Sequence, residues 1–71
     1  MKEYLVILER GEQCWGAYAP DVPGCIATGA TSEEAERLFA EALAFHLEGL
    51  VLEGLPLPEP SSTARIVRIG A

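Results

Sequence analysis

The sequence predicts a small α+β domain with the element order βββαβ, and three observations predict it. Three short β-rich runs separated by turn residues come first. A long segment with helical periodicity and a cap at each end follows. A last β-branched run, residues 64–69, comes after a proline-rich connector. We expect one domain over residues 1–71: a three-stranded antiparallel meander, one long helix, and a fourth strand parallel to the first through a right-handed crossover.

The three expected strands are bounded by turn residues. Residues 3–9 read EYLVILE, an apolar run typical of a strand that is covered on both faces. Residues 13–19 alternate in the manner of a second strand, and residues 25–28 form a short third strand that Gly29 ends. Between these two strands, Pro23-Gly24 suits the centre of a type II turn.

A helix over residues 32–53 has recognisable start and stop signals. Thr31 fits the N-cap and Glu34 the third helical position, which is the spacing of a capping box. Gly54 fits the residue after the C-cap, and Pro56 prevents continuation. The inner stripe of this helix is predicted to be Ala35, Leu38, Phe39, Ala42, Leu43, His46 and Leu50.

The expected helix is longer than the expected sheet, roughly 33 Å against about 17–23 Å. Its overhanging end is apolar, and a chain of this size buries only about 60% of its unfolded surface. We therefore predict self-association, as a dimer or a tetramer, although the proline segment could instead fold back over this end. The candidate partner or oligomer interface comprises Trp15, Tyr18, Asp21, Leu47, Val51, Leu52, Leu55 and Leu57.

Charge and composition exclude several classes of function. Five basic against eleven acidic side chains give a net charge of −6, which argues against direct nucleic-acid binding. No segment approaches the roughly 20 apolar residues of a membrane span. Cys14 and Cys25 do not make a disulfide framework, so we expect a cytoplasmic protein with reduced thiols.

The sequence offers no catalytic, cofactor-binding or metal-binding set, so we expect no enzyme and no cofactor. His46 is the single histidine and has no companion ligands at the usual spacings. Asp21 is interpreted as a turn residue that also contacts a partner. The enzymatic alternative is a residual nuclease centred on Asp21 with Glu3 or Glu9.

Two motifs carry a family resemblance. The run APDVPGC over residues 19–25 is followed by GATSEEA over residues 29–35, and later segments up to Pro58 continue the match in order. In these motifs the chain resembles the HicB family of antitoxin-related proteins. The resemblance implies a truncated ribonuclease-H-like βββαβ unit.

The resemblance also implies a function. HicB antitoxins bind and neutralise HicA, a small basic toxin with a double-stranded-RNA-binding fold that cleaves mRNA, and an acidic chain suits such a partner. Neutralisation would occur by occlusion of the toxin. Since the sequence stops after the expected fourth strand, we expect no C-terminal DNA-binding domain of the kind full-length HicB proteins carry. The alternatives are a residual ribonuclease-H-like enzyme and a homo-oligomeric scaffold or small-ligand-binding domain.

Overall fold

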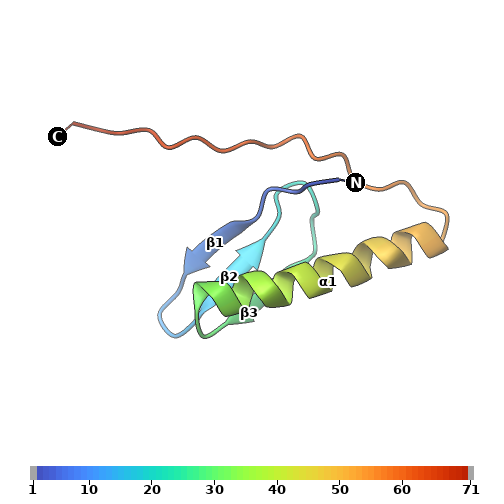
Figure 1. Cartoon of the computed structure of the whole chain (residues 1–71), viewed down its shortest axis with the longest axis horizontal. Helices are drawn as coiled ribbons and strands as arrows, with labels where there is room; N and C mark the ends of the chain where they lie inside the picture. The colour runs from blue at the N-terminus through green and yellow to red at the C-terminus, as the bar shows by residue number, and fades with distance from the viewer. Residues whose placement is uncertain (1, 71) are drawn as a thin grey trace.

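The computed structural model describes residues 2–70 and has three strands followed by one helix (Figure 1). The strands are β1 (Ile7–Arg10), β2 (Trp15–Tyr18) and β3 (Ile26–Gly29), and the helix is α1 (Ser32–Leu52). The sheet order is β1-β2-β3 with both pairs antiparallel, so the predicted meander is confirmed. Helix α1 lies across one face of this sheet (Figure 1).

The register of the strands decides which side chains face the helix. Ala17 pairs with Leu8 on one side and with Ala27 on the other, and Ala17 is fully buried. Side chains alternate along a strand, so the neighbouring row, Ile7, Tyr18 and Ile26, points to the opposite face. No second layer of helices covers that face in the part of the chain that the structure describes.

Both predicted helix caps are confirmed. The Thr31 hydroxyl accepts a hydrogen bond from the Glu34 amide at 3.0 Å, and the Glu34 carboxylate accepts one from the Ala30 amide at 2.6 Å. At the other end, Gly54 has a φ of 72° and donates to Val51, while Leu55 donates to Leu50. These two bonds form a Schellman motif, in which glycine takes the left-handed conformation without strain.

The core is small and lies between the sheet and the first half of α1. Its buried members come from β2, from the β2–β3 loop and from two positions of the helix: Ala17, Ala19, Val22, Cys25, Ala35 and Phe39. Phe39 and Val22 are the largest fully buried side chains. A core of this size leaves the second half of α1 outside the sheet, and that half carries Leu47, Val51 and Leu52 of the candidate interface.

The predicted fourth strand is absent from the single chain. Residues 64–69 are extended but belong to no strand, and β1 pairs only with β2. Figure 1 shows the C-terminal segment (red) running away from β1. The physical reason lies just before it, because residues 61 and 62 are bound to Asp21 in the β2–β3 loop rather than to β1. The first strand is also shorter than predicted, since residues 3–6 are extended without being assigned to the sheet.

Candidate functional site

The C-terminal end of α1 carries an exposed apolar surface, which we call the helix-end patch: Leu47, Val51, Leu52, Leu55 and Leu57. A helix of 21 residues is about 31 Å long, whereas four-residue strands span about 13 Å, so this end extends past the sheet. Leu52 is 79% exposed, and Val51 and Leu55 are also exposed. The proline segment turns back past the helix end, yet only Leu47 and Leu57 become half-buried. The predicted overhang is therefore present and largely uncovered.

A groove of about 420 Å³, here called the α1–β3 groove, opens between the second half of α1 and the start of β3. Its lining is mostly apolar and comprises Gly24, Cys25, Ile26, Ala42, Phe45, His46, Gly49, Leu50 and Glu53. Phe45 is 80% exposed at its margin, and Ile26 is also exposed. Gly49 has no atom within 4 Å of where a Cβ would lie, so the helix backbone is open to a partner there.

The polar groups of this groove are His46 and Glu53. His46 was predicted to lie on the inner stripe of the helix, but it is exposed. It does lie on the stripe that faces the core, one turn beyond Ala42, but the sheet stops before reaching it. Glu53, at the C-cap, adds a carboxylate to an apolar lining. Such a groove suits a partner segment that combines an apolar side chain with a basic one.

Trp15 and Tyr18 do not share a surface. Trp15 faces α1 and packs half-buried against the core, whereas Tyr18 belongs to the row on the open face of the sheet. They lie three positions apart in one strand, and residues at an odd spacing point to opposite faces of a sheet. The sequence therefore grouped two aromatic residues that the fold places on opposite faces, and only Tyr18 remains available as a contact on the open face.

Asp21 holds the proline-rich connector that follows the helix, residues 55–62. Its Oδ2 accepts hydrogen bonds from the Ser61 and Ser62 amides at 3.0 and 2.9 Å, and its Oδ1 accepts from their hydroxyls at 3.2 and 2.8 Å. The backbone hydrogen bond from Ser62, followed by that residue's hydroxyl, lowers the pKa of Asp21, because both donors stabilise the charged form. Asp21 therefore joins two distant parts of the chain. We call these four hydrogen bonds the Asp21 clamp.

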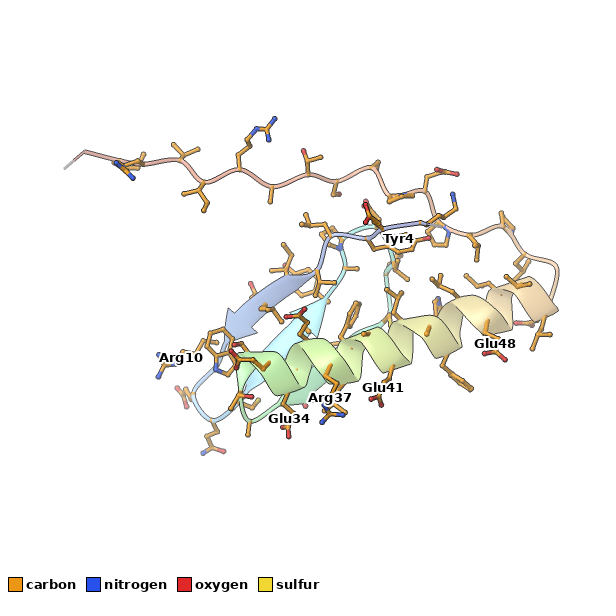
Figure 2. The ribbon with its side chains drawn as sticks, in the orientation of Figure 1. Tyr4, Arg10, Glu34, Arg37, Glu41 and Glu48 are labelled. Atoms are coloured by element: carbon orange, nitrogen blue, oxygen red, sulfur yellow. The ribbon has the colours of Figure 1, made fainter. Side chains whose placement is uncertain are left out.

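Two further contacts hold the connector beside the N-terminal segment. The Tyr4 hydroxyl donates to the Pro58 carbonyl at 2.6 Å, and the Lys2 ammonium lies 3.2 Å from the Glu59 carboxylate. Figure 2 shows Tyr4 pointing to this part of the chain. The Lys2–Glu59 pair is exposed and adds little stability, so Tyr4 and the Asp21 clamp are the main attachments.

The metal-binding and thiol side chains among residues 2–70 bear on whether the chain could catalyse a reaction. No group of three or more histidine, cysteine or acidic side chains there could hold a metal ion. Cys14 is exposed and Cys25 buried, both as free thiols, and burial raises the pKa of the Cys25 thiol. No helix in the described part of the chain is both long and apolar enough to cross a bilayer.

The family model described as "HicB_like antitoxin of bacterial toxin-antitoxin system" matches residues 4–69, nearly the whole chain. The chain belongs to the HicB-like antitoxin family. The resemblance carried by the APDVPGC and GATSEEA motifs is therefore confirmed.

Two curated relatives and one solved structure extend this finding. The chain is 36% identical over 56 residues to an uncharacterized 14.9 kDa protein of Haemophilus phage HP1, and the match spans 79% of the chain but 42% of the phage protein. It is 35% identical over 57 residues to a UPF0150 protein of Synechocystis, covering 79% of this chain and 72% of that one. One chain of a structure described as "HicA3 and HicB3 toxin-antitoxin complex" matches with a TM-score of 0.69 and 33% identity, over 84% of this chain and 70% of its own length.

The sequence reasoning missed the residues that shape the α1–β3 groove. Phe45 and Ile26 were absent from the candidate interface, and Gly49 was given no role. Phe45 could have been found on a helical wheel, because it lies at the margin of the inner stripe. Nothing in the sequence indicates that Ile26 is exposed. Its side chain is exposed because no further element covers the sheet face opposite α1 in the described part of the chain.

Proposed function

We propose that this HicB-like chain is the antitoxin of a toxin–antitoxin pair and neutralises a small basic HicA-type toxin by occluding its RNA-binding face. The observation that carries the proposal is the 33% identity to a chain of the HicA3 and HicB3 complex, with a shared fold over 84% of this chain. The family match over residues 4–69 supports the same class of function. No catalysis by this chain is needed for occlusion, and the proposal places the protein in the cytoplasm beside the mRNA that its partner attacks.

The charge of the molecule supports a basic partner. The chain carries a net charge of −6, and the outer side of α1 presents Glu41 and Glu48 (Figure 2). Complementary potential accelerates the encounter of two proteins and orients them, while apolar contact supplies most of the affinity. The α1–β3 groove offers both, since its mostly apolar lining includes the exposed Phe45 and also includes Glu53. We therefore assign the toxin contact to this groove.

A matched pair of charge reversals tests this assignment. Glu53→Arg places a cation in the groove, whereas Glu48→Arg makes the same change on the outer side of α1. A cation near a helix C-terminus suits the helix dipole, so neither change should unfold the chain. With a small basic HicA-type protein as the titrant, we expect Glu53→Arg to weaken binding at least tenfold by titration calorimetry and Glu48→Arg to change it less than threefold.

The functional readout is growth of cells that express the toxin. Co-expression of the unaltered chain should restore growth, and Glu53→Arg should restore it less well than Glu48→Arg. Equal loss with both variants would contradict the groove assignment while leaving the antitoxin proposal intact. Failure of the unaltered chain to bind any HicA-type protein would contradict the antitoxin proposal itself.

The helix-end patch supports a second proposal, self-association of the antitoxin. Val51, Leu52 and Leu55 form an apolar surface that a second copy could cover without occupying the α1–β3 groove. We also propose that the architecture is a truncated ribonuclease-H-like unit, whose first three strands and helix have the observed order. Completing that unit would require residues 64–69 to join a sheet.

A further inference from the structure

Residues 63–70, the 63–70 segment, form an extended stretch of β-branched and basic residues with no partner in the single chain. In the part of the chain that the structure describes, tertiary hydrogen bonds to the connector stop at Ser62. Ile66 is fully exposed, and Val67 and Ile69 are each three-quarters exposed. Three large apolar side chains in so short an exposed stretch, with strand-forming neighbours, are typical of a strand that lacks its sheet.

The sheet of the same molecule has a free edge of matching character. β1 pairs with β2 on one side only, and the extended residues Leu5 and Val6 lead directly into it. An edge strand presents unpaired N–H and C=O groups to any extended chain that can reach them. Together with Leu5 and Val6, this edge is as apolar as the 63–70 segment. It is also longer than the edge at β3, because α1 begins only three residues after β3 ends.

The two parts carry opposite charge. Arg65 and Arg68 give the 63–70 segment a charge of +2, whereas three basic and all eleven acidic side chains give the rest of the chain −8. Residues 2–12, which include β1, carry three glutamates and two basic residues, so this stretch has a net charge of −1. The net charge of the rest of the chain therefore favours placing the basic 63–70 segment against the body of a molecule of this kind.

The attachment of the connector bears on whether the 63–70 segment pairs with β1 of its own chain or with β1 of a second copy. The Asp21 clamp fixes residues 61 and 62 to the β2–β3 loop, so the 63–70 segment starts from that loop. From that point Figure 1 shows the 63–70 segment running clear of its own sheet. To reach its own β1 the segment would have to bend back directly after the clamp, whereas a second copy can present its β1 edge to the segment where it lies.

We infer that two copies of this chain exchange strands, the 63–70 segment of each adding to the β1 edge of the other. The exchange is reciprocal, so it closes as a two-fold dimer and completes a four-stranded sheet in each half. The inference concerns assembly of this chain with itself and stands independently of the antitoxin proposal. The helix-end patch is a separate surface, and Leu52→Glu removes its contribution to self-association.

The test measures mass by light scattering after size exclusion, using the full chain with Leu52→Glu in every sample. Two adjacent prolines, Ile66→Pro with Val67→Pro, remove backbone donors on both sides of the strand but leave the segment extended. We expect the Leu52→Glu chain to have twice the 7.6 kDa mass of one chain, and the proline variant to have half that value. The control, Ile66→Val with Val67→Ile, keeps the donors and the apolar volume and should remain dimeric.

Hydrogen exchange followed by nuclear magnetic resonance identifies the strands involved. In the dimer, amides of residues 64–69 should be protected, and the protection should be lost on dilution to the monomer. A monomer with a protected segment would overturn the inference in favour of pairing within one chain. A dimer in which the segment exchanges freely, or one that survives the two prolines, would overturn it as well. So would a monomeric chain whose segment becomes protected only when a toxin is added.

Discussion

Gly29 is the residue that allows the helix to approach the sheet. A Cβ at this position would lie 2.6 Å from the Ala35 nitrogen and 3.0 Å from the Glu34 carbonyl carbon, both backbone atoms of the first helical turn. Gly16, in the neighbouring strand, would meet nothing within 4 Å. The close approach of strand and helix therefore depends on Gly29, which the sequence analysis treated only as the end of a strand.

Replacing Gly29 by alanine should separate the helix start from β3. Backbone atoms cannot move aside as the tip of a side chain can, so we expect Gly29→Ala to lower the free energy of unfolding by about 1–3 kcal/mol. Gly16→Ala adds the same methyl group where space is open and should change it by less than about 0.5 kcal/mol. Urea unfolding followed by circular dichroism measures both, and an equal loss in the two variants would contradict this explanation.

Asp21 gives the attachment of the connector a pH dependence. Its pKa in the folded chain lies below the 3.8 of an ordinary aspartate, so its stabilising effect is complete above that value. As pH falls through the lowered pKa, protonation removes the acceptor from the Ser61 and Ser62 amides. We expect the resonances of these two amides to move together toward unfolded positions below about pH 4.

The control for Asp21 is Asp21→Asn, which keeps the shape but leaves only one acceptor oxygen. In this variant the Ser61 and Ser62 resonances should be displaced already at neutral pH and should not titrate. Titration of these amides in the asparagine variant would assign the effect to another group. The sequence interpretation of Asp21 as a turn residue could not include this role, because Ser61 is 40 positions away in the chain.

At the scale of elements, the helix was the most predictable part of the molecule. Its start, its end and its Schellman motif follow from short-range rules that involve Thr31, Glu34 and Gly54. The Arg37–Glu41 pair at 3.3 Å also follows from their spacing of four, and Figure 2 shows both on the outer side of the helix. Local hydrogen bonds and spacing need no knowledge of the tertiary fold, which is why the sequence sufficed here.

Removal of the N-cap hydroxyl tests the weight of this local chemistry. Thr31→Ala leaves the Glu34 amide without its partner, so we expect a loss of about 1 kcal/mol in the free energy of unfolding. Thr31→Ser keeps the hydroxyl and should stay within a few tenths of a kcal/mol of the unaltered chain. Equal stability of the alanine and serine variants in urea unfolding would mean that water satisfies this amide equally well.

The overhang of α1 was predicted from lengths alone, yet its detailed faces were not. His46 was placed on the inner stripe and Phe45 on neither face, because a helical wheel does not say where the sheet ends. In the structure the sheet ends after the first half of the helix, so His46 is exposed and the α1–β3 groove opens beside it. Helix periodicity predicts which way a side chain points, whereas its burial depends on whether a neighbouring element lies there.

Leu52→Glu tests the helix-end patch as a surface for self-association. The side chain is 79% exposed, so a glutamate there should leave the fold unchanged but oppose burial against a second copy. By sedimentation equilibrium we expect a lower mass than for the unaltered chain, with circular dichroism and the protection of residues 64–69 retained. Ala44→Glu, on the exposed outer side of the helix, is the control that should keep the mass of the unaltered chain.

At the scale of the whole molecule, the sequence predicted the order of the elements better than their assembly. The meander and the helix formed as expected, because each is specified by nearby turn and cap residues. The fourth strand did not join its own sheet, because the clamp by Asp21 fixes the chain just ahead of it. A β-rich run such as residues 64–69 identifies a strand, but nothing in the run specifies which edge it will join.

The free β1 edge has a consequence for growth beyond two copies. If one molecule lends its 63–70 segment to a neighbour that lends its own to a third, one end of the row keeps a bare β1 edge and the other end keeps an unused segment. Such a row elongates into a fibre instead of closing. Concentrated protein should therefore reveal whether closure is strict, because fibres scatter light increasingly with time while closed pairs do not.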